Sequence, residues 1–347
     1  MTILSPEYAL NCSSEYQEKK LHGRWITLDH LKKILPTYHH SSILNFDSIG
    51  KSEEMRAIFR ITLGTGKKRV LIWSQMHGNE STGTKALFDL FNYLTQCKDE
   101  IAESILSECT LYAIPLLNPD GAQKYTRVNA HEIDLNRDAV DRKAKESKLL
   151  RSVLDELQPD FCFNLHDQRT IFGVEGTNNP ATISFLAPSE EVTRNVTEGR
   201  KRTMNIIVAM NHLLQQIIPA HVGRYTDEFY PTATGDNFQK LGYSTILIES
   251  GHYPNDYQRE ESRKFTFISL LQGIYHIATA SNFESYKEYF NIPNNQKNFR
   301  DLLLEQKDGR KIAFQYEEIL EGNEIKFIPK KVEDDFSAFL FHKKTFS

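Results

Sequence analysis

Cysteine is scarce in this chain, and its placement argues against a disulfide scaffold. Only four of the 347 residues are cysteines, namely Cys12, Cys97, Cys109 and Cys162. No two of them stand in a Cys-x-x-Cys pair, the spacing typical of redox and metal motifs. Cys109 and Cys162 lie within apolar segments, where a reduced cysteine behaves as a small hydrophobic residue. We therefore expect buried free thiols at these two positions.

Long apolar runs and an excess of one charge are also lacking. No apolar stretch approaches the roughly 20 residues of a membrane-spanning helix, and the N-terminus has no basic segment followed by an apolar one, as a signal peptide would. Lys and Arg number 42 against 46 Asp and Glu, which gives a formal net charge of −4. Interspersed charges of this kind argue against a nucleic acid or an anionic membrane as partner. We expect a cytoplasmic protein that binds neither.

Short apolar segments alternate with amphipathic ones from about residue 55 onward. We predict strands at 57–63, 69–75, 110–117, 161–165 and 245–249, and helices at 82–95, 147–157, 190–217 and 260–280. In the first helix, Leu87, Leu90, Phe91 and Leu94 recur at intervals of three and four, which makes one apolar stripe. Strands and helices in this order indicate an α/β fold, with a mixed, twisted β-sheet covered by helices on both faces.

The character of the sequence changes near residue 283. Residues 291–295 form a turn-rich break, and beyond it the segments 311–316 and 324–328 alternate between apolar and polar residues, as strands of a small antiparallel unit do. We predict a catalytic domain over residues 1–284 and a small β-rich C-terminal appendage over residues 285–347. The appendage contains no cluster of chemically active residues, so we expect it to have a structural role.

Residues suited to metal chemistry follow three of the predicted strands. His77 and Glu80 stand three residues apart just after the strand at 69–75, His166 follows the strand at 161–165, and Glu249 ends the strand at 245–249. In open α/β sheets, ligands bind beyond the carboxyl ends of the strands. A catalytic zinc ion takes three protein ligands, commonly His and Glu, and leaves a position for water. Taken singly, each residue has an ordinary structural interpretation; their joint occurrence indicates a metal hydrolase.

Together with two further blocks, these residues resemble a known family. The blocks are Asn118-Pro119-Asp120-Gly121 followed by Arg127, and Asp134-Leu135-Asn136-Arg137-Asp138. Between about residues 50 and 255 the motifs occur in the order found in zinc metallocarboxypeptidases of the carboxypeptidase A type and their bacterial relatives. The resemblance implies that one zinc ion is held by His77, Glu80 and His166, that Glu249 is the general base, that Arg127 polarises the scissile carbonyl, and that Asn136 and Arg137 hold the substrate's terminal carboxylate.

The chain departs from the family pattern in several places. Asp138 follows the Asn-Arg pair, and the stretch from Glu80 to His166 is shorter than in the digestive enzymes, so the loops around the substrate must differ. The family's mobile tyrosine corresponds to Tyr225 or Tyr230, between which the sequence does not choose. Asp236 lies where the family sets its side-chain preference. It either attracts a basic side chain or belongs to an ordinary Gly-Asp-Asn turn.

The resemblance implies a zinc-dependent metallocarboxypeptidase that hydrolyses the C-terminal peptide bond of peptides with a metal-activated water. The alternative is an N-acyl amino acid deacylase of the succinylglutamate desuccinylase or aspartoacylase type, which shares the His-Gly-Asn-Glu motif, the Asn-Arg pair and the later His and Glu. The block at 118–121 with Arg127 favours the peptidase. A non-catalytic binding protein on the same scaffold is disfavoured because all ligands and Glu249 are present. The expected substrate is a peptide or N-acyl amino acid with a free carboxylate.

The other histidines have no partner at ligand spacing, and we do not expect them to bind metal; they include His39, His40, His131, His212, His221 and His276. His252, three residues after Glu249, is a candidate for the rim of the site. For support of the metal ligands, the candidates are Asn164 and Asp167, which flank His166.

Overall fold

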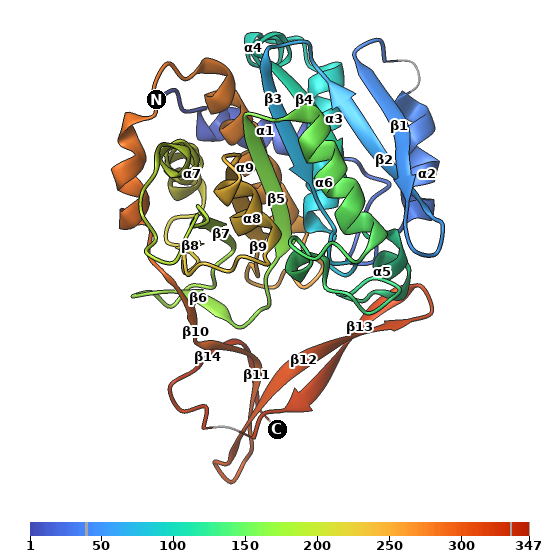
Figure 1. Ribbon diagram of the computed structural model, residues 1–347. Helices are drawn as coiled ribbons and strands as arrows, with labels where there is room; N and C mark the ends of the chain where they lie inside the picture. The colour runs from blue at the N-terminus through green and yellow to red at the C-terminus, as the bar shows by residue number, and fades with distance from the viewer. Residues whose placement is uncertain (39–40, 334, 347) are drawn as a thin grey trace.

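A mixed eight-stranded sheet forms the centre of the molecule in the computed structural model, which describes residues 1–38, 41–333 and 335–346. From edge to edge its strands are β1 (Leu44–Lys51), β2 (Ala57–Leu63), β4 (Cys109–Ile114), β3 (Lys68–Trp73), β5 (Phe161–Asp167), β9 (Ser244–Ser250), β7 (Ile183–Leu186) and β8 (Val222–Arg224). The central strands β4, β3, β5 and β9 run parallel. Their carboxyl ends therefore open on one edge of the sheet, at the bottom of Figure 1.

Helices cover both faces of this sheet, as predicted. One face carries α1 (Pro6–Glu15), α3 (Thr82–Gln96), α4 (Glu100–Glu108), α7 (Glu198–Ile217) and α9 (Glu260–Thr279); the other carries α6 (Lys145–Leu157) and α8 (Thr234–Lys240). Successive side chains of a strand point to opposite faces. In β3, Val70 and Ile72 accordingly join the core beneath α3 and α9, whereas Leu71 and Trp73 join the core beneath α6.

Most predicted elements occur close to their expected bounds, with two differences. The predicted helix 190–217 begins only at Glu198, because the Thr197 hydroxyl accepts a hydrogen bond from the Arg200 backbone N–H and caps the first turn. The predicted strand 110–117 ends at Ile114, and Pro115 follows it. The helices α1 and α4 and the short strands β6 (Phe172–Val174), β7 and β8 were not predicted.

The remaining helical segments of the body are short. They are α2 (Leu28–Ile34), α5 (Pro119–Lys124), and the 3-10 turns η1 (Leu35–Tyr38), η2 (Leu135–Arg137) and η3 (Glu284–Asn291). Tyr289 of η3 and the adjacent Ile292 are buried in the main core. Among the described residues, none of the helices combines the length and apolar composition that crossing a membrane requires. Cys109 and Cys162 are buried free thiols, as expected.

A second, four-stranded sheet lies beyond the carboxyl ends of the central strands (Figure 1). Its strands, in spatial order, are β13 (Glu324–Lys331), β12 (Lys311–Glu321), β11 (Phe299–Glu305) and β14 (Leu340–Phe346). We call it the C-terminal sheet. The prediction of a β-rich appendage is confirmed, but β14 runs parallel to β11, so the sheet is not purely antiparallel. The preceding strand β10 (Asn295–Lys297) pairs with β6 of the body.

Candidate active site

The turn between β3 and α3 carries two of the predicted metal ligands. The buried Gln75 amide donates to the Gly78 carbonyl oxygen at 2.8 Å and so holds the turn closed. Gly78 itself leaves no room for a side chain, because a Cβ atom there would lie 2.0 Å from the backbone carbonyl carbon of Gly121. The turn is thus pressed against the start of α5. This packing directs His77 and Glu80 toward the end of β5.

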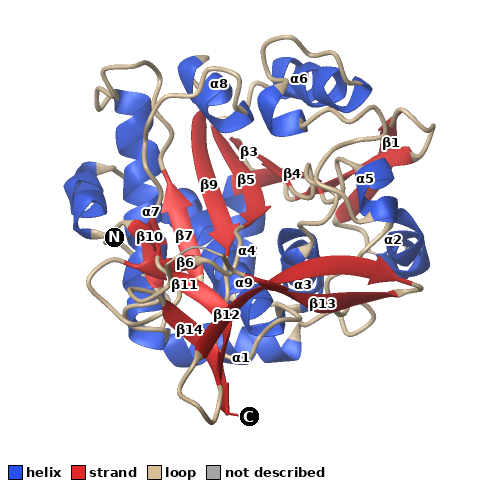
Figure 2. Ribbon diagram, turned by 90° about the horizontal axis from the view of Figure 1, so that it is seen from below, coloured by secondary structure: helices blue, strands red, loops and turns tan. Residues whose placement is uncertain are grey.

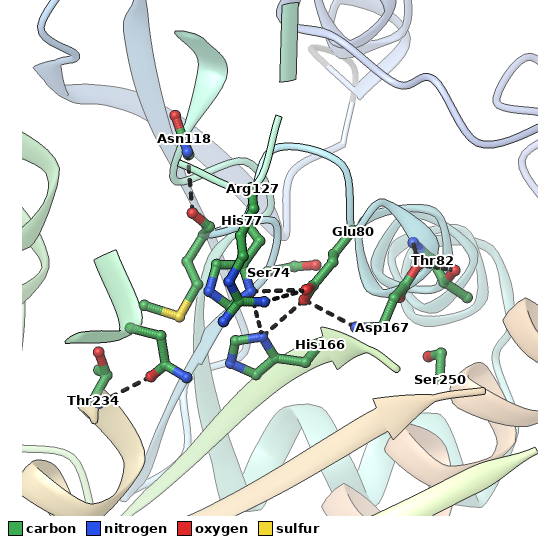
Figure 3. A network of polar contacts seen from close by, with 12 residues as sticks. Ser74, His77, Glu80, Thr82, Asn118, Arg127, His166, Asp167, Thr234 and Ser250 are labelled. Atoms are coloured by element: carbon green, nitrogen blue, oxygen red, sulfur yellow. Dashed lines mark hydrogen bonds and ion pairs between the residues drawn. The ribbon is translucent and has the colours of Figure 1, made fainter. Parts of the chain in front are cut away.

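The structure brings His77, Glu80 and His166 together at one buried point (Figure 3). The His77 Nδ1 atom lies 2.9 Å from Glu80 Oε1, and the His166 Nδ1 atom lies 2.9 Å from Glu80 Oε2. The two Nδ1 atoms are 3.1 Å apart. Lone pairs of two neutral imidazoles repel at that distance unless a proton or a cation lies between them. Two imidazole nitrogens and a carboxylate fit a zinc ion, although the same ligands hold other divalent metals.

Asp134 determines which nitrogen of His77 faces the other two candidate ligands. Its Oδ1 atom lies 3.0 Å from His77 Nε2, and its Oδ2 atom accepts a hydrogen bond of 3.0 Å from Arg127 Nε. A proton on Nε2 leaves the Nδ1 lone pair directed at Glu80, which is the arrangement that carboxylate–histidine–metal groups use. Asp134 begins the motif at 134–138, but this contact was not predicted from the sequence.

The two residues predicted to support His166 behave differently. The backbone N–H of Asp167 donates to Glu80 Oε2 at 3.1 Å, and its side chain accepts a hydrogen bond of 2.6 Å from the Thr82 hydroxyl at the start of α3. Asp167 therefore steadies the candidate ligand Glu80. The side-chain amide of Asn164 is buried and makes no hydrogen bond within the described part of the chain, so it does not hold His166 in place.

Glu249 stands directly beside His166, because the two residues are register partners on the parallel strands β9 and β5. Its carboxylate lines the same cleft as the three candidate ligands and has no hydrogen-bond partner among the described residues. Burial raises the pKa of Glu249 well above its usual value, and the negative charges of Glu80 and Asp167 add to that rise. A divalent cation at the ligands would oppose the rise.

Three predicted substrate-side residues also face the cleft. The exposed Arg127 guanidinium contacts Glu80 Oε1 through Nη1 at 3.2 Å. Asn136 is positioned by α8, because its Oδ1 atom accepts a hydrogen bond of 3.0 Å from the Thr234 backbone N–H. Arg137 is exposed, and the one hydrogen bond that its side chain makes to the described residues runs from Nη1 to the Asn136 carbonyl oxygen at 2.7 Å. Its remaining donors are available to a ligand.

Of the two candidate tyrosines, the structure brings only Tyr225 to the cleft. Its ring packs edge-on against Phe172 with the ring centroids 5.3 Å apart. Tyr230 does not line the cleft. Its side chain is half exposed, and its hydroxyl donates to Glu228 at 3.3 Å, because the backbone around it is turned outward by a hydrogen bond to Asp236.

Two further sequence-based candidates have local structural roles. Asp236 lies in the first turn of α8, where its Oδ1 atom accepts the Tyr230 backbone N–H at 3.0 Å, and burial raises its pKa to about 6. It does not line the cleft, and it belongs to the start of a helix rather than to a separate Gly-Asp-Asn turn. His252 is buried between Tyr257 and His342, away from the rim. His39 and His40 lie outside the described residues.

The cleft has a volume of about 500 Å³. Its walls also include residues that sequence reasoning missed: Arg24, Gln168, Arg169, Arg259, Tyr316 and Glu318. Gln168 and Arg169 follow His166 directly, and this adjacency was a usable signal. Arg24 comes from the N-terminal segment, and Tyr316 and Glu318 come from β12 of the C-terminal sheet. No local pattern marks these three.

Comparison with known proteins supports the resemblance inferred from the motifs. Residues 35–163 match a family model described as zinc carboxypeptidase. Carboxypeptidase SOL1 of Arabidopsis thaliana is 27% identical over 192 residues, which cover 49% of this chain and 39% of that protein. Carboxypeptidase M of Mus musculus is 29% identical over 129 residues, 32% of this chain and 29% of that protein. The alignment thus spans well under half the length of either relative.

Solved structures show the same fold at low sequence identity. A metallo-carboxypeptidase from Burkholderia cenocepacia superposes with a TM-score of 0.60 at 19% identity, over 73% of this chain and 70% of that one. Carboxypeptidase A from Helicoverpa armigera gives a TM-score of 0.58 at 15% identity, over 79% and 80% of the two chains. The expected fold is therefore confirmed. The family-model match contains His77 and Glu80 and ends before His166 and Glu249.

Proposed function

We propose that this chain, which resembles the zinc carboxypeptidases in sequence and in fold, is a zinc-dependent metallocarboxypeptidase that releases the C-terminal residue of a peptide. The observation that carries the proposal is the convergence of two imidazole Nδ1 atoms and one carboxylate beside a second carboxylate, Glu249, with no partner of its own. One zinc ion held by His77, Glu80 and His166 would polarise the scissile carbonyl and lower the pKa of a bound water to about 7.

Glu249 and Arg127 have separate tasks in this proposal. The Glu249 carboxylate accepts a proton from the attacking water and later delivers it to the leaving amine, which is general base and then general acid catalysis. Arg127 is held by Asp134 through Nε and by Glu80 through Nη1. Its Nη2 group makes no hydrogen bond to the described residues, so it can donate to the carbonyl oxygen where negative charge develops.

Asn136 and Arg137 account for attack at the chain end. A guanidinium grips a carboxylate with two parallel hydrogen bonds, and the free donors of Arg137 face the cleft that contains Glu249. In a peptide only the last residue carries a main-chain carboxylate. A substrate held there places its last peptide bond, and no other, beside the reacting groups.

The proposal is tested with zinc-loaded protein and a mixed substrate pool followed by mass spectrometry. The pool contains peptides with free C-termini, the same peptides with amidated C-termini, and N-acyl amino acids. We expect loss of one C-terminal residue from the free-ended peptides alone, and the released residue identifies the side-chain preference. Cleavage of the N-acyl amino acids alone would overturn the peptidase assignment and favour the deacylase.

Replacing Arg137 with alanine is expected to lower kcat/KM on free-ended peptides by about 10- to 100-fold, the usual effect of losing hydrogen bonds of about 1.5–3 kcal/mol to a charged group. Arg137→Lys keeps the charge but not the paired geometry, so we expect it to recover only part of the loss. Arg142→Ala, on the exposed surface, serves as the control. An unchanged kcat/KM of Arg137→Ala on the free-ended peptides would contradict the carboxylate assignment.

A further inference from the structure

The C-terminal sheet, for which the sequence suggested only a structural role, forms part of the cleft wall. Tyr316 and Glu318 of β12 line the same cavity as the three candidate ligands and Glu249. They are two residues apart on one strand and therefore share a face. Glu317 lies between them on the opposite face, where its exposed carboxylate pairs with Lys330 at 3.1 Å. The side of β12 that faces the cleft is thus distinct from its solvent side.

Glu318 is fixed to the catalytic body by two contacts. Its Oε2 atom accepts a hydrogen bond of 3.0 Å from Arg24 Nη2 and another from the Tyr125 hydroxyl. The Arg24 side chain is only 5% exposed, and the Arg24 carbonyl oxygen accepts a hydrogen bond of 2.6 Å from Ser81, next to the start of α3. A charged pair with this support, in which Arg24 is buried and Glu318 partly buried, holds β12 in one position relative to the turn that carries His77 and Glu80.

The loop after β9 provides a second attachment. Asp301 of β11 is fully buried and accepts hydrogen bonds from the Tyr257 hydroxyl at 2.9 Å and the Tyr316 backbone N–H at 2.8 Å. The Tyr257 ring packs against Tyr316 and Phe327, with centroids 5.2 and 5.3 Å away. These contacts join the C-terminal sheet to the segment that follows Glu249. The C-terminal sheet is therefore held in a defined position against the cleft and is not loosely tethered.

The wall stands on the side of the ligands away from the carboxylate-binding pair. Figure 3 shows Thr234, which holds Asn136, on one side of the His77–Glu80–His166 group, and Thr82 with Asp167 on the other. Seen from below, α8 and β12 likewise lie on opposite sides of the ends of β5 and β9 (Figure 2). A peptide with its carboxylate at Arg137 and its last bond at the ligands extends its preceding residues toward β12.

We propose that the C-terminal sheet closes the upstream end of the cleft and restricts the enzyme to short peptides, with Tyr316 as the residue that limits substrate length. This inference rests on the proposed carboxypeptidase function. The cleft volume of about 500 Å³ falls within the roughly 300–1,000 Å³ typical of sites for small molecules. A longer peptide must pass over β12 or displace it.

The test is a ladder of N-acetylated peptides, from two to eight residues, that share one C-terminal residue chosen from the pool experiment. For the unsubstituted enzyme we expect kcat/KM to fall by about tenfold or more between the short and long ends of the ladder, equivalent to about 1.4 kcal/mol or more. For Tyr316→Ala we expect the long-to-short ratio of kcat/KM to rise by about tenfold. Glu317→Ala, one residue away on the solvent face, should leave the ratio unchanged.

The outcomes distinguish a failure of this inference from a failure of the proposed carboxypeptidase function. A flat length profile in the unsubstituted enzyme, with the short peptides cleaved, overturns the closure and leaves the carboxypeptidase assignment standing; this comparison needs no variant to fold. The melting temperature shows whether the Tyr316→Ala protein is folded. If it is folded and its long-to-short ratio of kcat/KM is unchanged, Tyr316 does not limit substrate length. No cleavage anywhere in the ladder overturns the proposed function and this inference with it.

Discussion

Replacing Glu249 with glutamine is expected to lower kcat by about 10²- to 10⁴-fold, the usual contribution of general acid–base catalysis, while the protein still retains zinc. The amide has nearly the same size and shape as the carboxylate, so the cleft is preserved, but it cannot accept a proton from water. Glu249 has no hydrogen-bond partner among the described residues, so the substitution breaks no existing contact. Steady-state kinetics and metal analysis on the same preparation measure the two effects separately.

The matched control for this variant is Glu228→Gln. Glu228 is an exposed carboxylate that contacts Tyr230 outside the cleft, so the same chemical change there should leave kcat unaltered. Activity of Glu249→Gln within about tenfold of the unsubstituted enzyme would mean that another group accepts the proton. Loss of zinc together with activity would instead indicate that Glu249 is a metal ligand. It would contradict the proposal that His166 binds the metal and Glu249 accepts the proton.

Replacing His166 with alanine is expected to abolish zinc retention, and activity is expected to disappear with it. The variant removes one of three protein ligands and leaves Glu80 and His77 to hold a cation alone, short of the usual number for a catalytic zinc site. Equilibrium dialysis against a zinc buffer, with metal content measured by mass spectrometry, reports binding independently of any substrate. We expect one ion per chain before the substitution and close to none after it.

His212→Ala is the control for the metal measurement. His212 lies on α7 and pairs with Glu288 at 2.9 Å on the exposed surface, so its loss should not change the zinc content. One ion retained by His166→Ala would show that the metal is held elsewhere. Thermal denaturation of both variants distinguishes loss of a ligand from loss of the fold.

The candidate site was predictable where its residues stand at the ends of strands. Val70 to Trp73 and Phe161 to Leu165 are largely apolar runs that belong in a buried sheet. His166 follows its run directly and His77 follows after a short turn, so both were expected at the carboxyl edge of the sheet. The contact of Asp134 with His77 spans 57 positions in the chain. This contact forms because the loop after α5 folds back over the turn between β3 and α3. The local sequence pattern does not predict that fold-back.

Two features that the sequence left undecided or undetected have the same physical origin. Tyr225 and Tyr230 are five residues apart in an irregular segment, and only the hydrogen bond from the Tyr230 backbone to Asp236 shows which of them turns away. The C-terminal sheet was assigned a structural role because its sequence contains no active-site motif. Its part in the cleft arises from the contact of Glu318 with Arg24, 294 positions earlier in the chain.

By itself, the sequence determined the alternation of strands and helices and the two-sided core, and it placed the candidate metal ligands and Glu249 near strand ends, because hydrophobic periodicity and strand ends are local properties. Tertiary structure alone decided the contact of Asp134 with His77, which of the two tyrosines lines the cleft, and the position of β12 in the cleft wall. Each of these depends on side chains that meet only after distant segments have packed. The free energy that holds those segments together comes from the apolar surface buried throughout the fold.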